Sequence, residues 1–396
     1  MRLILYAGKG GVGKTSLAAA SAVIAAQRGQ KTLVMSLDPA HSLSDAFDLP
    51  IDLMDKHGGK PREVAPRVWI QELDIHEELE SNWGEVHRYL ATLLNTTGID
   101  DILAEELAVL PGMEEISALL HINHYIQAKE YDLIILDCAP TAESLRFVSL
   151  PTTLDWYMKK VFKLERRIVR YLRPVASRLS EVPLPDDDYF AAIARLFSRL
   201  EGADKLLTDP KVTSVRLVTN PEKMVLRETQ RAFMYFRLNQ LAIDAVIINR
   251  LLPPGAPDAY LDAWRESQAS YLELARTYFE PLPILTAPWG REEMLGPQRL
   301  GELGQAVFGE QDPAAIFYQR EACRFRRENG RAEVRLHLPF ATSQAVNLSK
   351  VGDELIIRAG TAKKSLILPR SFAALEPQRA RVSGDELIVD FGGGDD

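Results

Sequence analysis

The sequence predicts an α/β protein with a parallel β-sheet, followed by a small all-β region. Up to about residue 285, short apolar runs alternate with helical stretches, as in β-α-β units whose strands are covered on both faces. Two mostly helical stretches, residues 76–130 and 153–205, interrupt this pattern. After about residue 328 the sequence changes to short alternating runs separated by turn residues, which is typical of antiparallel strands.

Each expected strand of the parallel sheet contains its own run of apolar residues. They are Leu3–Tyr6, Thr32–Leu37, Val68–Leu73, Asp132–Leu136, Ser214–Thr219, Ala245–Ile248 and Leu282–Leu285. The Ala-rich segment Ser16–Arg28 predicts a helix that ends at Gly29. We expect this domain to span residues 1–325, with the two helical stretches forming one inserted subdomain.

The C-terminal region, residues 331–391, is expected to form a small β-sandwich. Its apolar runs are Val334–Leu338, Leu355–Ile357, Leu366–Leu368 and Leu387–Val389. Gly352-Asp353 and Gly384-Asp385 predict two similar hairpin turns. Residues 392–396 are expected to form a disordered tail.

Composition excludes several classes of protein. The 396 residues are 46% hydrophobic and 26% charged, which argues against collagen-like, low-complexity and disordered chains. The net charge of −8 argues against a nucleic-acid binder. The two cysteines form no CxxC, which argues against a disulfide scaffold or a zinc ribbon. No apolar run approaches the ~20 residues of a membrane span and no signal peptide is recognisable, so we expect a cytoplasmic protein.

A phosphate-binding loop is predicted directly after the first strand. Gly8–Thr15, GKGGVGKT, fits G-x-x-x-x-G-K-[ST] between a strand and a helix, which makes a Gly-rich turn without a ligand improbable. The glycines allow the backbone N–H groups to approach a polyphosphate, and the helix that follows adds partial positive charge. Lys14 is expected to bridge the β- and γ-phosphates, and the Thr15 hydroxyl to ligate Mg²⁺. The candidate nucleotide-binding residues of this segment are Gly8, Lys9, Gly10, Gly11, Val12, Gly13, Lys14, Thr15 and Ser16.

Two aspartates end apolar strands of the predicted sheet. Asp38 follows one strand and Asp137 another, and the carboxyl ends of parallel strands meet at one ligand-binding edge. Asp137 is expected to hold Mg²⁺ through water, and Asp38 to position or deprotonate the attacking water. The alternative for Asp38 is a turn cap with no catalytic role.

Together with the loop, Asp38–Phe47 resembles the arsenite-pump ATPase and the guided-entry ATPase that targets tail-anchored membrane proteins. The resemblance covers about residues 1–310. Further matching segments are Leu110–Glu115, Asp137–Thr141, Leu145–Phe147, Leu150–Pro151 and Ile247–Asn249. The resemblance implies ATP and Mg²⁺ as cofactors, Asp38 as the catalytic carboxylate of a first switch and residues 137–151 as a second. It also implies that Asn249 recognises adenine and, less specifically, that Pro283 lies beside the base.

The second lysine of the loop, Lys9, resembles the signature lysine of one branch of P-loop ATPases. In that branch the lysine reaches across a homodimer interface to the partner's nucleotide, so the resemblance implies a homodimer with Lys9, Lys14 and Asp38 as catalytic residues. A cation there would stabilise charge that develops in the transition state. The alternative is a solvated loop lysine.

Three departures from the family pattern stand out. Cys138 replaces a threonine, and Ala142-Glu143 replace Gly-His in the second switch, which puts the coupling of hydrolysis to that switch in doubt. The dimer-bridging CxxC is absent, so no interfacial zinc is expected. Arsenite needs a cluster of soft thiolates, and two cysteines cannot supply one, so an arsenite pump is not expected.

The C-terminal region resembles the α-crystallin-like domain of small heat-shock proteins. The likeness rests on Gly360, on Leu366–Pro369 and on Gly384–Val389. A small sandwich that serves only as a dimer brace or a lid is the alternative.

The family resemblance also implies partners for the helical insert. In the targeting ATPases, ATP closes the dimer and paired helical subdomains form an apolar groove for a transmembrane helix. Hydrophobic protein segments are therefore the expected partners, with transient membrane contact and no nucleic acid. A spatial regulator of the partition or septum-positioning type and a nucleotide-gated binding module with little turnover remain alternatives.

Residues 158–178 bear on that groove, because they combine an apolar stripe with a basic face. The stripe is Met158, Val161, Phe162, Ile168, Val169, Leu172 and Val175. The basic residues are Lys159, Lys160, Lys163, Arg166, Arg167, Arg170, Arg173 and Arg178. The segment fits an amphipathic helix packed on its own core, and the functional alternatives are a groove wall or a contact with acidic lipid headgroups.

Overall fold

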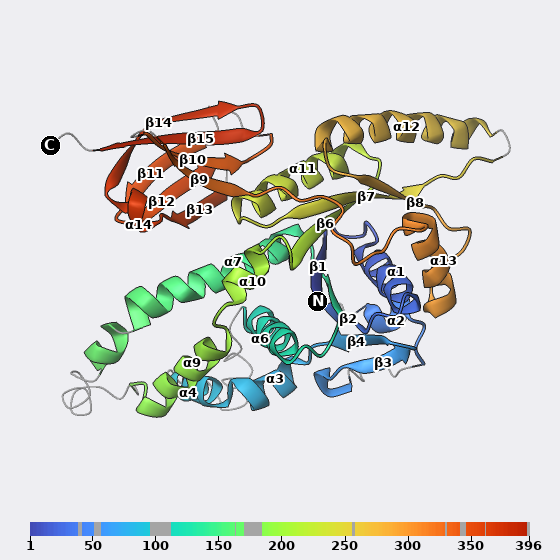
Figure 1. Cartoon of the computed structure of the whole chain (residues 1–396). Coiled ribbons are helices and arrows are strands. Elements are labelled where there is room, and N and C mark those ends of the chain that lie inside the picture. The colour runs from blue at the N-terminus through green and yellow to red at the C-terminus, as the bar shows by residue number, and fades with distance from the viewer. Residues whose placement is uncertain are drawn as a thin grey trace. The chain divides into compact units, whose positions relative to one another are not determined.

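The structure is a computed structural model of the chain, and Figure 1 labels its helices and strands. It describes residues 1–38, 42–50, 57–95, 112–162, 164–169, 184–255, 258–328, 331–340, 346–360 and 362–393. The chain divides into two compact units, which are described separately. The first comprises Met1–Leu3, Thr15–Leu206 and Met294–Gly304, and the second Ile4–Lys14, Leu207–Glu293 and Gln305–Asp396.

Eight strands form one sheet in the order β3-β4-β2-β5-β1-β6-β7-β8. They are β1 (Arg2–Ala7), β2 (Thr32–Ser36), β3 (Arg62–Ala65), β4 (Val68–Glu72), β5 (Leu133–Asp137), β6 (Thr213–Thr219), β7 (Ile243–Leu251) and β8 (Ile284–Pro288). β2 pairs in parallel with β4 and β5, and β7 with β6 and β8. β2, β5 and β6 are buried along their whole length, as continuous apolar runs predict. The expected α/β fold is confirmed.

One strand of this sheet was not expected. β3 pairs antiparallel with β4 at the edge of the sheet. Its residues are half-buried or exposed, and only Val64 and Ala65 are apolar. An edge strand with a solvated face lacks the continuous apolar run by which the buried strands were found.

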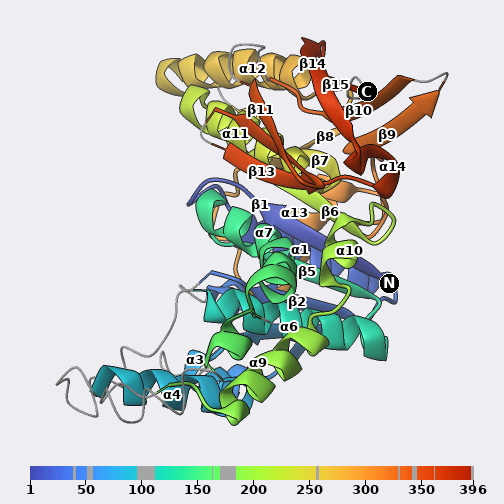
Figure 2. The same cartoon turned by 90° about the vertical axis from the view of Figure 1, so that its left-hand side faces the viewer.

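The first unit carries the helical insert. The helices of the chain up to residue 208 are α1 (Lys14–Gln27), α2 (Leu43–Ala46), η1 (His57–Gly59), α3 (Ile75–Asn82), α4 (Gly84–Asn95), α6 (Met113–Ala128), α7 (Thr141–Tyr157), η2 (Met158–Phe162), α9 (Asp187–Arg199) and α10 (Ala203–Thr208). α3, α4, α6 and α9 pack on one another, and Figure 2 shows α3, α4 and α9 together. Residues 103–111 and 170–183, on which part of the expected insert depends, lie outside the described residues.

The second unit contains helices α11 (Lys223–Leu238) and α12 (Ala259–Phe279), and α13 (Gly296–Phe308) spans both units. α11 packs on β6 and β7, and α12 on β7. No helix among the described residues is long and apolar enough to cross a membrane.

The C-terminal region of this unit is all antiparallel strands apart from the short helix α14 (Arg370–Ala373), which confirms the expected all-β region. One sheet has the order β14-β15-β10-β9 and the other β11-β12-β13. The strands are β9 (Cys323–Glu328), β10 (Arg331–His337), β11 (Val346–Val351), β12 (Glu354–Ala359), β13 (Ala362–Ile367), β14 (Leu375–Ser383) and β15 (Glu386–Gly393). Gly352 and Gly384, both at positive φ, begin the two expected hairpin turns.

The limits of this region differ from the expected ones at both ends. β9 pairs with β10, so the antiparallel structure begins before residue 331. Gly392 and Gly393, expected in a disordered tail, pair with Glu376 and Leu375 of β14. The prediction was wrong for these two glycines because the pairing partner lies on a polar strand that the sequence does not reveal. Residues 394–396 lie outside the described part.

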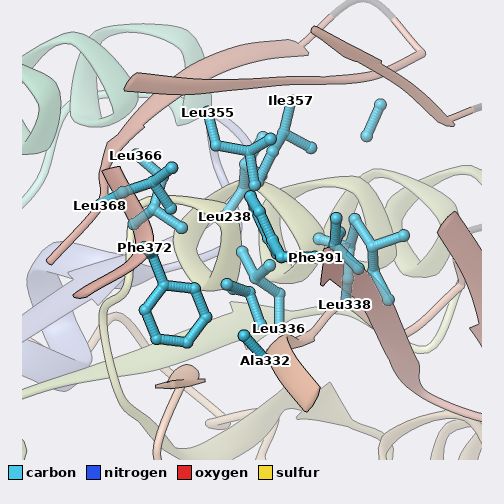
Figure 3. Close-up of a cluster of buried hydrophobic side chains, with 14 residues drawn as sticks. Leu238, Ala332, Leu336, Leu338, Leu355, Ile357, Leu366, Leu368, Phe372 and Phe391 are labelled. Atoms are coloured by element: carbon cyan, nitrogen blue, oxygen red, sulfur yellow. The ribbon is translucent and has the colours of Figure 1, made fainter. Parts of the chain in front are cut away.

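The two sheets share one apolar core, and a helix from the preceding part of the chain completes it. Leu238, at the end of α11, is 1% exposed and lies among Leu336, Leu355 and Phe391 (Figure 3). The neighbouring Arg237 donates hydrogen bonds to the carbonyl oxygens of Arg320 and Glu321. The antiparallel region therefore folds against α11 rather than standing apart on a linker.

Candidate functional site

The loop from Gly8 to Lys14 belongs to the second unit and connects buried strand β1 to helix α1. Gly8 is buried, and a Cβ atom at this position would lie 2.2 Å from the carbonyl oxygen of Val218 in β6. A backbone oxygen cannot move aside as a side chain can, so close contact between β1 and β6 requires a glycine where the loop begins.

A second glycine of the loop makes room for Asn249 of β7. Gly13 has a φ of 92°, and a Cβ there would lie 2.3 Å from Asn249 Nδ2. That amide nitrogen donates to the Val12 carbonyl oxygen at 2.8 Å, and Asn249 Oδ1 accepts from the Arg250 N–H. The structure thus brings Asn249 to the loop backbone, where its amide holds the loop. Its expected contact with adenine stays a prediction.

The two lysines of the loop differ in their surroundings. Lys14 is 6% exposed, and its ammonium donates to the Lys9 carbonyl oxygen at 3.3 Å. This places a positive charge over the loop backbone, where phosphate oxygens would bind. Lys9 is half-buried, and no residue in the described part of the chain pairs with its ammonium.

In the first unit, three oxygen-bearing side chains gather at the beginning of α1. Thr15 Oγ1 donates to Asp137 Oδ2 at 2.6 Å and lies 3.2 Å from Ser42 Oγ. Asp137 ends β5 and is 1% exposed. Hydroxyl and carboxylate oxygens are the donors that Mg²⁺ takes, usually with water and substrate phosphates. Groups of three or more His, Cys, Asp or Glu that could hold a metal do not occur among the described residues.

Asp38 lies at the same edge of the sheet. Its backbone N–H donates to Ser36 Oγ, and this hydroxyl donates to the Asp38 carbonyl oxygen, both at 3.2 Å. Ser36 is in register with Asp137 on the neighbouring strand β5. Asp38 therefore follows β2 at the carboxyl ends of adjacent strands, as the sequence predicts. Residues 39–41, which include His41, lie outside the described residues.

The structure does not bring Pro283 to this loop. Pro283 precedes β8, and its carbonyl oxygen accepts from the Val246 N–H at the beginning of that strand pair. Asn249 lies near the opposite, carboxyl end, where Leu251 is in register with Pro288. Pro288 is the proline at the carboxyl end of β8, and the expected position of Pro283 beside the base stays a prediction. The sequence shows a proline on each side of this apolar run, but it does not show which proline stands at the carboxyl end, because the limits of the strand are not known from sequence.

Sequence reasoning also passed over Ser42 as a site residue. Ser42 stands in the segment that carries the family resemblance, yet nothing in the motif singles out its hydroxyl. Its position beside Thr15 depends on a fold contact between residues 27 positions apart.

Replacing Gly8 by alanine is expected to destabilise the protein by about 1–3 kcal/mol, because the methyl group overlaps the Val218 oxygen. Gly11→Ala is the matched control: its Cβ would meet nothing within 4 Å, so only the positive φ of 76° costs energy, about 1 kcal/mol. Urea unfolding gives both values. A larger loss for Gly11→Ala than for Gly8→Ala would contradict the proposed contact.

Comparison with known proteins agrees with this geometry. Residues 1–309 match the sequence model of a family described as anion-transporting ATPase, and residues 329–391 match an HSP20-like domain found in ArsA. A protein of Aquifex aeolicus whose name assigns it to the arsenical pump-driving ATPases is 44% identical over 393 residues, 98% of this chain and 99% of its own. ATPase GET3B of Arabidopsis thaliana is 30% identical over 329 residues, 77% of this chain and 78% of its own.

The family model covers most of the chain, and the Aquifex protein matches it almost from end to end. The resemblance seen in the phosphate loop, in Asp38–Phe47 and in the C-terminal strands is thereby confirmed. The chain belongs to the anion-transporting ATPases of the ArsA family: it is an ATPase that carries the HSP20-like domain found in ArsA.

Proposed function

We propose that this ATPase is a Mg²⁺-dependent homodimer of the cytoplasm that binds and shields hydrophobic protein segments. The observation that carries the proposal is a set of large apolar side chains left exposed on the helical insert. Trp156, Leu164 and Ile168 are 47%, 54% and 46% exposed. Leu164 and Ile168 stand four residues apart in helical residues 164–169 and therefore share one face, and exposed apolar surface of this kind marks a binding surface.

Leu164 and Ile168 lie in the segment 158–178, for which the sequence left a groove wall, a lipid contact and packing on its own core as interpretations. Phe162 is buried and packs against Phe190 of α9, as in an amphipathic helix on its own core. Leu164 and Ile168 follow it and stay exposed, beside the exposed Arg166 and Arg167. The segment therefore contributes to the core at Phe162 and offers an apolar surface with a basic border beyond it.

In the proposed reaction, water attacks the γ-phosphorus of ATP and the bond to the bridging oxygen of ADP breaks. A bound Mg²⁺ would neutralise charge on the β- and γ-phosphate oxygens, held by the Thr15 hydroxyl and, through water, by Asp137. The Lys14 ammonium and the loop N–H groups would hold the phosphates, and Asp38 would orient the water. Lys9 would supply charge to the site of the partner subunit.

The two cysteines speak against an arsenical cargo. Cys138 is fully buried, and its thiol donates to the Leu136 carbonyl oxygen. Burial raises the pKa of Cys323 to about 12, so this thiol is protonated at neutral pH. Arsenite binds thiolates, and neither the buried Cys138 nor the half-buried, protonated Cys323 offers one at the surface. The arsenical pump in the names of relatives is therefore not proposed for this chain.

A defined probe tests the proposal. A peptide with one transmembrane helix, fused to a soluble carrier, is offered to Asp38→Asn with Mg-ATP or with Mg-ADP. We expect ATP-dependent capture, and we expect Ile168→Asp to weaken it about tenfold, which corresponds to ~1.4 kcal/mol, because burying such a side chain contributes at least that much. Met224→Asp is the matched control, since Met224 of α11 is 73% exposed outside the insert.

Two results would refute the proposal that the protein binds hydrophobic protein segments. One is the absence of ATP-dependent capture, and the other is an equal loss with Met224→Asp. Phosphatidylserine vesicles form a separate arm of the experiment. Binding to vesicles without capture of the peptide would replace the client surface with a membrane contact through Arg166 and Arg167.

A further inference from the structure

Glu72 is a buried carboxylate at the carboxyl end of β4, only 8% exposed. Its Oε1 accepts from the backbone N–H groups of Leu43 and Ser44, at 2.9 and 3.1 Å. Its Oε2 accepts from the Ser44 hydroxyl at 2.7 Å. All three donors belong to the first turn of α2, so a single side chain of the sheet holds the beginning of this helix.

The N-cap residue of α2 does not hold the beginning of this helix. Ser42, the N-cap residue of α2, forms no side-chain hydrogen bond to the helix. A helix of four residues has almost no stability of its own, because the cost of the first turn is not repaid by further hydrogen bonds. The position of α2 therefore depends on its contacts with the sheet, and Glu72, 28 residues from Ser44 and 29 from Leu43, supplies the polar ones. The fully buried Leu43 supplies an apolar one.

The same contacts determine where Ser42 lies. Ser42 directly precedes Leu43, and its hydroxyl is 3.2 Å from Thr15 Oγ1, the group that also donates to Asp137. If Leu43 and Ser44 were released from Glu72, the Ser42 hydroxyl would lose its fixed distance from Thr15. Glu72 touches none of the phosphate-loop side chains, so it acts through this chain segment.

The backbone of Asp38 is held in a corresponding way. Ser36 of β2 binds its backbone, and Ser36 is in register with Glu72 on the adjacent strand β4. Asp38 and the beginning of α2 are thus each tied to the carboxyl end of a strand, Asp38 by Ser36 and the backbone of Leu43 and Ser44 by Glu72.

We propose that Glu72 is a positioning residue for ATP hydrolysis, which holds the beginning of α2 so that the Ser42 hydroxyl stays beside Thr15. The inference rests on the proposed role of Asp38 and adds a residue that touches neither nucleotide nor metal. It predicts an effect on turnover rather than on nucleotide affinity, because the loop itself is left intact.

The test compares kcat and KM for Mg-ATP in the full-length chain. Glu72→Ala and the volume-preserving Glu72→Met remove the acceptors and are expected to lower kcat at least tenfold, with KM changed less than threefold. Glu72→Gln keeps one oxygen for the two N–H groups and is expected to retain at least a third of kcat. Glu78→Gln is the matched control: Glu78 is 5% exposed in α3 and accepts from Asn82, so its loss should leave kcat within twofold.

The outcomes separate this inference from the role of Asp38. Folded Glu72→Ala or Glu72→Met with a normal kcat would overturn it, as would a loss of kcat with Glu78→Gln of the same size. A KM that rises while kcat stays constant would also overturn it. Asp38→Asn is measured in parallel: a normal rate there together with a loss in Glu72→Met would refute Asp38 and leave Glu72 as the residue that positions Ser42.

Discussion

Replacing Asp38 by asparagine is expected to lower kcat for ATP hydrolysis at least about a hundredfold, while the affinity for Mg-ATP stays within about threefold. The carboxylate lies at the carboxyl end of β2, beside the strand that carries Asp137, and its backbone is held by Ser36. An amide of the same shape keeps the fold and the loop but cannot accept a proton from the attacking water. The loss should therefore fall on the chemical step and not on binding.

Single-turnover hydrolysis with enzyme in excess over ATP measures that step directly. Asp45→Asn is the matched control, because Asp45 is an exposed carboxylate on α2, seven positions along the chain, and it is not among the site residues that we assign. We expect the control to hydrolyse ATP at the wild-type rate. Equal rates for Asp38→Asn and the wild type would leave only the turn-cap interpretation of this residue.

The buried centre of the parallel sheet could be predicted because its strands are covered on both faces. β2, β5 and β6 consist of buried residues throughout, and such runs stand out in a sequence. Strands with a solvated face lack such a continuous apolar run. β3 was missed for this reason, and so was β14, whose residues are half-buried or exposed and include two arginines.

The residues of the candidate site likewise differ in whether the sequence alone could predict them. Gly8, Gly13, Lys14 and Thr15 could be named in advance because the geometry of a phosphate loop is encoded in eight consecutive residues. Glu72 could not be named, since its role depends on the parallel register of β2 and β4. A local motif predicts the residues of the phosphate loop. The residues that hold Asp38 and the beginning of α2 can be found only when the order of strands in the sheet is known.

Which of Pro283 and Pro288 lies at the ligand-binding edge also depends on the register of the strands. Both prolines stand near β8, and the sequence shows that a proline lies close to this strand. The ligand-binding edge is the carboxyl end of parallel strands, so a shift of five residues along one strand moves the candidate to the opposite edge. Only the register with Leu251 of β7 identifies Pro288 as the proline at that edge.

Lys9→Ala is expected to abolish hydrolysis in a homodimer, and pairing it with Asp38→Asn is expected to restore it. If Lys9 serves the partner's nucleotide, a heterodimer of the two variants has one site with its own Asp38 and the partner's intact Lys9. Heterodimers isolated through two different affinity tags should then show roughly half the wild-type activity, since one of two equivalent sites is complete. The half-buried Lys9, unlike Lys14, has no bond to its own loop through its ammonium among the described residues.

The matched control for this complementation is Lys14→Ala paired with Asp38→Asn. Lys14 is buried and its ammonium lies over the backbone of its own loop, so each site of that heterodimer lacks one of its own essential groups and should stay inactive. Activity in the Lys9 pair with none in the Lys14 pair would place one lysine in trans and the other in cis. Silence in both pairs would mean that Lys9 acts within its own subunit, and an active Lys9→Ala homodimer would mean that Lys9 is not needed for hydrolysis. Failure to isolate any heterodimer would count against the proposed homodimer.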